Sequence, residues 1–157
     1  MSRQMWPLIM KKVFQWTNSF KPFCMHKTFL ITACILAAIA VILGAFGAHG
    51  LRQFVPPETI STFETGVRYQ FYHSFALLVA GMLFEKGKRS WMKFACISFL
   101  FGIILFSGSL YLLTIFKATD TVGLTKLGII TPLGGLFFIA GWIALAIALS
   151  LSPWRTA

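Results

Sequence analysis

The residues best able to carry out chemistry lie in two short stretches, one that closes an apolar segment and one that opens the next. The first, from Gly44 to Arg52, reads GAFGAHGLR, and the second, from Glu64 to Ser74, reads ETGVRYQFYHS. Imidazole, carboxylate and guanidinium groups can transfer protons or bind ions, and at membrane depth they usually face protein or water. The candidate polar cluster has six members: His49, Arg52, Glu64, Arg68, Tyr69 and His73.

Three interpretations of this polar cluster are open. In the first the residues are structural, because Glu64 and Arg68 lie four apart in the order that favours an ion pair on a helix, and Arg52 extends to lipid phosphate. In the second the cluster lines a path for protons or a small solute. In the third His49 and His73 hold a metal ion or haem, but two histidines without a third ligand do not define such a site. We expect structural roles, no metal ion and no cofactor.

Patterns of known catalytic centres are not recognisable in the chain. There is no HExxH motif, no paired-carboxylate arrangement and no Ser-His-Asp order. The glycines of the first stretch do not form a nucleotide-binding loop, since no strand precedes them and no Lys-Ser or Lys-Thr follows. The three cysteines, Cys24, Cys34 and Cys96, form no CxxC pair and predict buried apolar thiols. The sequence therefore predicts a protein that is not an enzyme.

The segments that must position these residues are apolar enough to lie in lipid. Of the 157 residues, 57% are hydrophobic and 11% are charged, and the mean hydropathy is +0.79. A soluble fold of this length could not bury so much apolar surface. An uncharged helix of about 20 residues crosses the hydrocarbon core of a bilayer. Four segments are predicted to cross it: residues 28–48, 67–84, 94–116 and 129–151.

The second of these segments has the shortest apolar run, from Phe71 to Phe84, and needs upstream polar residues to reach the far side of the membrane. It is the weakest of the four predicted spans. The predicted fold is an all-α, integral membrane four-helix bundle formed by residues 28–152.

The N-terminal segment, residues 1–27, is basic and rich in aromatic residues. The sequence is compatible with either an interfacial helix or a disordered tail in this segment. Met25 is a second candidate start, so residues 1–24 are treated as an extension. A cleaved signal peptide in place of the first span is disfavoured because the apolar run is longer than a usual signal core.

The distribution of Lys and Arg predicts the orientation, because cations are retained on the cytoplasmic side during insertion. Of the 14 Lys and Arg residues, ten lie before the first span, between the second and third, or after the fourth. Both termini are therefore predicted to be cytoplasmic. The net charge of +10 favours anionic lipid headgroups as partners rather than nucleic acid. The reason is that most of the Lys and Arg residues lie outside the hydrophobic spans, on one predicted side of the membrane. The opposite side receives Arg52, Arg68, Lys117 and Lys126.

Small residues recur at helical spacing within the spans and predict close packing of helices. Use of these stripes within one chain is favoured over contacts between copies, although self-association stays open. The packing positions are Ala33, Ala37, Ala40, Gly44 and Gly47 in the first span, Ser107, Gly108 and Ser109 in the third, and Gly134, Gly135 and Gly141 in the fourth.

Four motifs together resemble those of the small inner-membrane proteins of domain-of-unknown-function family 423. They are GAFGAHGLR from Gly44, YQFYHSFAL from Tyr69, FSGSLYLL from Phe106 and TPLGGLFFIAGW from Thr131. The resemblance covers about residues 25–152. It implies a multi-pass protein of the bacterial cytoplasmic (inner) membrane, with homologues in eukaryotes and no established activity.

The function expected from these features is a non-enzymatic, accessory or assembly role in the cytoplasmic membrane. The partners expected are membrane lipids and other membrane proteins or further copies of the chain, with no nucleic acid. The alternative is a small transporter or channel-like protein whose path is lined by His49, Glu64, Arg68 and His73. Four spans are few for alternating access, so that alternative would require oligomerisation.

Overall fold

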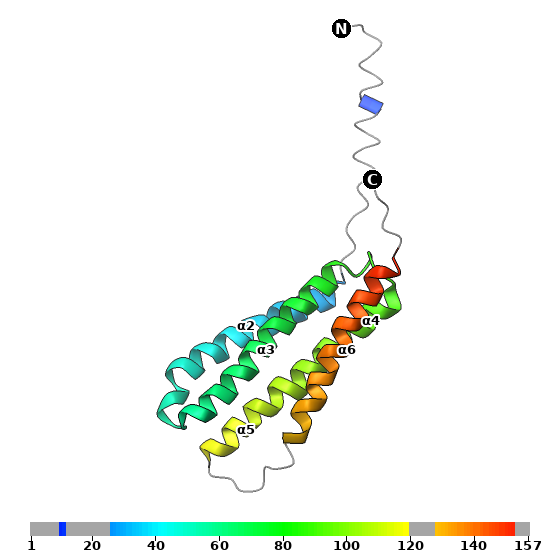
Figure 1. The fold of residues 1–157 in the computed structure, drawn as a ribbon. Helices are drawn as coiled ribbons and strands as arrows, with labels where there is room; N and C mark the ends of the chain where they lie inside the picture. Colours follow the sequence, from blue (N-terminus) through cyan, green and yellow to red (C-terminus); the bar gives the residue numbers. More distant parts are fainter. Residues whose placement is uncertain (1–9, 12–25, 120–127, 153–157) are drawn as a thin grey trace.

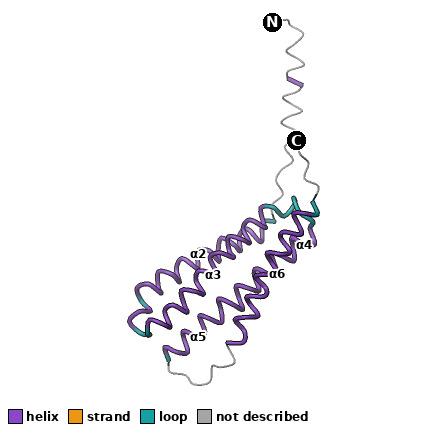
Figure 2. The backbone as a smooth tube through the Cα atoms, in the orientation of Figure 1, coloured by secondary structure: helices purple, strands orange, loops and turns teal. Residues whose placement is uncertain are grey.

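The computed structural model describes residues 10–11, 26–119 and 128–152. The helices of this part of the chain run in the order shown in Figures 1 and 2, and no strand occurs among the described residues. Most of the N-terminal segment and Lys126 lie outside the described residues. The helices are α2 (Lys27–His49), the 3₁₀ turn η1 (Leu51–Gln53), α3 (Pro57–Met82), α4 (Arg89–Gly102), the π-helix η2 (Ile103–Ser107), α5 (Gly108–Ala118) and α6 (Ile130–Ser150).

Three helical segments of the described chain are long and apolar enough to cross a membrane. They are Lys27–Gln53, Arg89–Ala118 and Ile130–Ser150, with 27, 30 and 21 residues. The second joins α4, η2 and α5 into one continuous rod. Among the described residues the structure is therefore all-α, and helices able to span a membrane lie at the first, third and fourth predicted spans.

Helix α3 has the length of a span without the hydropathy of one. It contains 26 residues and begins at Pro57, where the missing N–H costs nothing because the first turn of a helix has no partner for it. Arg68, Gln70 and His73 lower its hydropathy, although Gln70 and His73 are buried inside the bundle. A fourth crossing therefore stays a prediction.

Helix α3 occupies the centre of the bundle. It packs against α2 on one side and against the α4–η2–α5 rod on the other, while α6 packs against α4 and η2 (Figure 1). Two backbone hydrogen bonds tie one end of the bundle together: His26 N–H donates to Gly81 O at 3.3 Å, and Lys88 N–H donates to Ala148 O at 2.9 Å. We call this end the basic end and the opposite end, where η1 joins α2 to α3, the turn end.

Small residues let the helices approach closely. Ala33, Ala40 and Gly47 of α2 are buried, and a Cβ on Gly47 would stand 2.9 Å from the Phe63 ring of α3. On α6, Gly134 lies against the backbone of Phe106. The predicted small-residue stripe of α2 thus faces α3. At the remaining packing positions, a Cβ on Gly44 would contact Val67 and one on Gly141 would meet Phe99. A Cβ on Gly135 would come no closer than 3.9 Å to the Phe106 ring, and one on Gly108 would meet no other part of the bundle within 4 Å. Ala37 is half-buried.

The buried apolar side chains form two clusters at different levels of α3. The larger cluster includes Leu77, Ala80 and Phe84 and extends to the α4–η2–α5 rod and α6. The smaller lies at the turn end and consists of Leu51, Val55, Ile60 and Phe63. Between the two apolar clusters, α3 carries residues of the predicted polar cluster and their polar neighbours.

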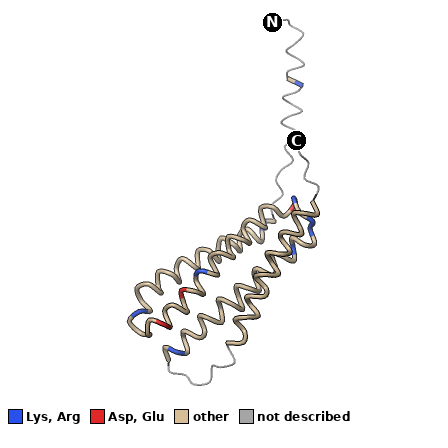
Figure 3. Tube along the Cα trace, viewed as in Figure 1, with Lys and Arg blue, Asp and Glu red and all other residues tan. Residues whose placement is uncertain are grey.

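Charged side chains gather at the two ends of the helical bundle, and α3 also carries charge part-way along its length (Figure 3). The described charges at the basic end are Lys27, Glu85, Lys86, Lys88, Arg89 and Lys93, and those at the turn end are Arg52, Glu58, Glu64 and Lys117. Arg68 lies near the midpoint of α3, where its side chain is exposed.

Candidate functional site

The six residues of the predicted polar cluster are divided between two places and the surface. Arg52 and Glu64 meet at the turn end, whereas His73 is buried in the interior. Tyr69 is 40% exposed and stacks beside the His73 ring, with ring centroids 5.9 Å apart. His49 and Arg68 are exposed. The structure therefore contains an outer cleft and an inner polar layer in place of one shared pocket.

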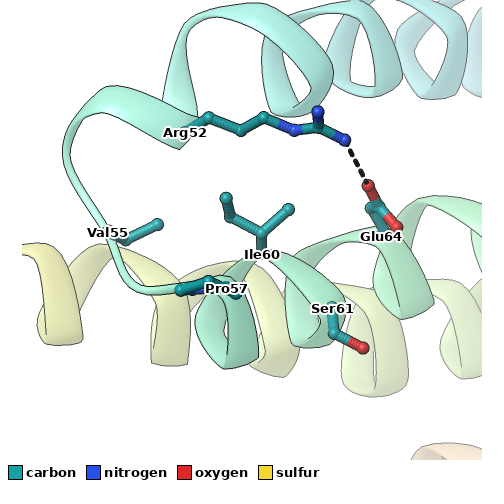
Figure 4. Close-up of a pocket in the computed structure, with 6 residues that line it drawn as sticks. All are labelled: Arg52, Val55, Pro57, Ile60, Ser61 and Glu64. Carbon is teal, nitrogen blue, oxygen red and sulfur yellow. Dashed lines mark ion pairs between the residues drawn. The ribbon is translucent and has the colours of Figure 1, made fainter.

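The outer cleft lies between η1 and the first two turns of α3 and has a volume of about 460 Å³. Figure 4 shows Arg52 extending from the turn across to Glu64 on α3, with Ile60 below the Arg52 side chain and Val55 on the connecting loop to the left. The Arg52 Nη2 to Glu64 Oε1 distance is 4.0 Å, and the two side chains are 62% and 46% exposed. The cleft is lined by Arg52, Val55, Pro57, Ile60, Ser61 and Glu64.

The partner of Glu64 differs from the expected one. The ion pair on one helix with Arg68 does not form in the described chain: Glu64 pairs with Arg52 across the turn, and the Arg68 guanidinium donates to Thr65 Oγ1 at 3.4 Å. The reason is the turn itself, because burial of Leu51 in the smaller apolar cluster brings η1 back onto α3. An exposed pair at this distance stabilises the fold by about 0–1 kcal/mol.

The inner polar layer is organised by Gln70, which joins three helices. Its Nε2 donates to Leu36 O of α2 at 2.8 Å, and its Oε1 accepts from the Tyr111 hydroxyl of α5 at 3.0 Å. Ser74 Oγ donates to the Gln70 carbonyl at 2.7 Å. Gln70 is not among the predicted site residues, although an uncharged amide inside an apolar segment is a signal for a hydrogen bond between helices.

His73 is 6% exposed and has both ring nitrogens occupied. Its Nδ1 lies 2.8 Å from the Tyr69 carbonyl, so Nδ1 carries the proton, and Nε2 accepts from Trp142 Nε1 at 3.4 Å. The imidazole also stacks on Phe138 with ring centroids 3.4 Å apart. A neutral imidazole held in this way keeps no free nitrogen for a metal ion or a transferred proton.

The two histidines of the polar cluster are too far apart to bind one metal ion. Gly47 of α2 packs on Phe63 of α3, and Phe63 precedes His73 by ten residues, or about 15 Å along the helix axis. His49 lies beyond Gly47 in the direction of the turn end. Within residues 26–119 and 128–152, no three His, Cys, Asp or Glu side chains are grouped closely enough to hold a metal ion.

The two serines of the third span differ in their partners. Ser109 Oγ lies 2.7 Å from Thr131 Oγ1 of α6 and donates to Phe106 O at 2.9 Å. Ser107 is fully buried, and its hydroxyl has no hydrogen-bond partner. It ends the π-helix at the point where α6 approaches most closely through Gly134. Ser109 therefore joins α5 to α6 by a hydrogen bond, whereas Ser107 is buried where η2 packs against α6 and makes no such bond.

The outer cleft and the Gln70–Tyr111 pair of the inner layer fall inside a match to a described family. Residues 43–135 match the family described as protein of unknown function DUF423. The chain belongs to the DUF423 family. The resemblance noted from the four motifs is thereby confirmed, over a segment that contains three of them in full and the beginning of the fourth.

Other DUF423-like chains support the same assignment. The chain is 41% identical over 129 residues to the UPF0382 membrane protein YwdK of Bacillus subtilis (strain 168), covering 78% of this chain and 95% of that one. It is 35% identical over 113 residues to the UPF0382 inner membrane protein YgdD of Escherichia coli (strain K12), covering 72% and 82%. No solved structure matches. With its three membrane-capable helices, this DUF423 member is a multi-pass protein of the bacterial cytoplasmic membrane.

Proposed function

We propose that this DUF423 protein is a non-enzymatic membrane protein that acts as an accessory or assembly component by binding other membrane proteins. The observation that carries the proposal is the use of the interior polar groups. Gln70 and Ser74 are hydrogen-bonded within the bundle, and both nitrogens of His73 are occupied. Gln70 and His73 Nε2 bond to other helices, whereas Ser74 and His73 Nδ1 bond within α3. Groups occupied in this way are not poised as a nucleophile or a general base.

The surface of α2 supports binding of a partner helix. Of the 18 most apolar consecutive residues in the Lys27–Gln53 segment, only 11% are buried inside the bundle. The corresponding fractions are 39% for the α4–η2–α5 rod and 33% for α6. The packing face of α2 is used by α3, and the opposite face exposes Ile35, Ile39 and Ile42 together with small residues. A smooth apolar face of this kind suits van der Waals packing with another membrane helix.

We further propose four crossings with both termini in the cytoplasm. Helix α3 is about 39 Å long by its 26 residues, which exceeds the hydrocarbon thickness. Its Gln70 and His73 face protein, as polar residues do in a spanning helix. Five Lys and Arg side chains lie at the basic end of the bundle, against Arg52 and Lys117 at the turn end, which is the asymmetry expected when the basic end faces the cytoplasm.

The topology can be tested with single cysteines in a chain whose three native cysteines are replaced. We expect a cysteine at Arg52 to react with a membrane-impermeant maleimide in intact cells, and one at Lys88 to react only after the membrane is opened. Labelling of both positions from outside would exclude a spanning α3. Labelling of position 88 alone would reverse the orientation.

The binding proposal can be tested by photo-crosslinking in cells. We expect a photo-reactive residue at Ile35 or Ile39 of α2 to give a discrete adduct with another membrane protein, because these side chains face away from α3. The matched control is Ile143 of α6, which is similarly exposed and should give no such adduct. The proposal fails if α2 gives no adduct and the chain is monomeric in mild detergent by light scattering.

The alternative, a path lined by His49, Glu64, Arg68 and His73, gains no support from a specific observation. His73 would be its deepest member, and the ring is covered by Phe138 and Trp142. The same cysteine scan addresses this alternative. Reaction of a cysteine at His73 with the impermeant reagent would mean that water enters the bundle and would favour the path.

A further inference from the structure

The outer cleft lies at the level where lipid headgroups begin. Between Lys27 and Arg52, 24 residues carry no charge, which corresponds to about 36 Å of helix. Between Lys93 and Lys117, 23 residues carry none, or about 35 Å. Both distances slightly exceed the hydrocarbon thickness of about 30 Å. Arg52 and the cleft that it lines are therefore placed at the boundary between acyl chains and headgroups.

The lining of the cleft is amphiphilic in the way a lipid is. Arg52 and Glu64 form one side, and the apolar residues Val55, Pro57 and Ile60 form the other, with Ser61 beside them. A volume of about 460 Å³ lies within the range of small-molecule sites. Phe54, which adjoins this wall in sequence, is 72% exposed. An aromatic ring exposed at this depth suits contact with lipid rather than with water.

The two charged groups of the cleft leave most of their hydrogen-bonding capacity unused. Their 4.0 Å separation is longer than the 2.7–2.9 Å typical of a direct charge-assisted hydrogen bond. A guanidinium has five N–H donors, and a carboxylate has two acceptor oxygens. A ligand that carries an anion and a cationic N–H donor a few atoms apart can bind both groups at once.

We propose that this cleft binds the headgroup of a phospholipid with a primary ammonium group. The phosphate binds the Arg52 guanidinium, the ammonium donates to the Glu64 carboxylate, and the glycerol and first methylenes lie along Val55, Pro57 and Ile60. A choline headgroup fits less well because its quaternary nitrogen has no N–H to donate, and the lining contains no aromatic ring to receive it. A phosphatidylglycerol headgroup would leave Glu64 beside an anion without a counter-charge.

The proposal can be tested by native mass spectrometry of the full chain in mild detergent. The probes are dioctanoyl phosphatidylethanolamine, phosphatidylglycerol and phosphatidylcholine. We expect phosphatidylethanolamine to bind about tenfold more tightly than either other lipid, since one hydrogen bond between charged groups is lost in each case. Equal binding of the three lipids by the unchanged chain would overturn the proposal.

Three variants separate the roles of the two charges. Arg52→Gln should weaken phosphatidylethanolamine binding about tenfold, and Glu64→Gln should abolish the preference over phosphatidylglycerol. Arg68→Gln is the matched control, because Arg68 is exposed and does not line the cleft. The proposal is refuted if Arg68→Gln has the effect of Arg52→Gln. All three positions are at least partly exposed, and unchanged unfolding midpoints would show that the variants are folded.

A soluble phosphodiester could supply the same headgroup chemistry. We therefore compare glycerophosphoethanolamine, which has the phosphate and the ammonium but no acyl chains. The lipid assignment predicts that it competes only at a concentration at least about tenfold higher, because it lacks the carbon atoms that contact the apolar wall. Equal affinity would reject a lipid as the ligand and identify the free headgroup.

Discussion

Gly134→Ala is expected to lower the free energy of unfolding by about 3 kcal/mol, the upper part of the usual range for overpacking. A Cβ at this position would stand 2.3 Å from the backbone nitrogen of Phe106 and 2.7 Å from its Cα. These are backbone atoms of the π-helix and cannot rotate aside, so α6 must move away from η2. That movement would also loosen the stacking of Phe138 on His73.

The neighbouring glycine provides the control for this change. A Cβ on Gly135 would meet the Phe106 ring at 3.9 Å, an ordinary contact. Gly135→Ala should therefore leave stability unchanged or raise it by about 0.5–1 kcal/mol, because alanine favours the helix. Both variants can be unfolded by SDS in dodecyl maltoside micelles and followed by tryptophan fluorescence. Equal effects at the two positions would contradict the close approach of α6 to η2.

The spans were predictable to the extent that they are uncharged. The segments at 28–48, 94–116 and 129–151 correspond to helices with membrane-compatible hydropathy, because their apolar runs are long enough to be recognised without knowledge of neighbours. Helix α3 is different. Its polar residues Gln70 and His73 are buried by other helices, so they lower its hydropathy without facing lipid. The span predicted at residues 67–84 was therefore the weakest of the four, and the burial of its polar residues becomes visible only once its packing partners are known.

The candidate site was less predictable because its contacts join distant parts of the chain. The rule for residues four apart pairs Glu64 with Arg68, but the rule cannot include Arg52, which approaches through the fold of the turn. In the same way, nothing in the sequence identifies Leu36 and Tyr111 as the partners of Gln70. The residue types that matter were visible in the sequence, whereas their pairing depends on helix packing.

The two polar features of the bundle are expected to have different roles. The Gln70 layer holds α2, α3 and α5 together in the interior, where an unpaired amide in hydrocarbon would be unfavourable. The Arg52–Glu64 cleft lies at the turn end and keeps exposed charges. Changes in the layer should therefore alter stability, and changes in the cleft should alter ligand binding with little effect on stability.

Gln70→Leu is expected to lower the free energy of unfolding by about 1–2 kcal/mol, because it removes the bonds to α2 and α5 while filling a similar volume. Tyr111→Phe removes one of these bonds and should cost about 1 kcal/mol. Gln53→Leu is the control, since Gln53 is exposed in η1 and should change stability by less than about 0.5 kcal/mol. The SDS titration used for the glycine variants measures all three.

The double variant Gln70→Leu, Tyr111→Phe decides whether the hydrogen bond itself is responsible. If the 3.0 Å bond couples the two side chains, the loss in the double variant should fall short of the sum of the single losses by about 0.5–1.5 kcal/mol. Strict additivity would mean that each residue stabilises the bundle by packing alone. In that case the polar layer would not connect α3 to α5, and its bond from Gln70 to the Leu36 carbonyl would be the remaining polar link between α3 and α2.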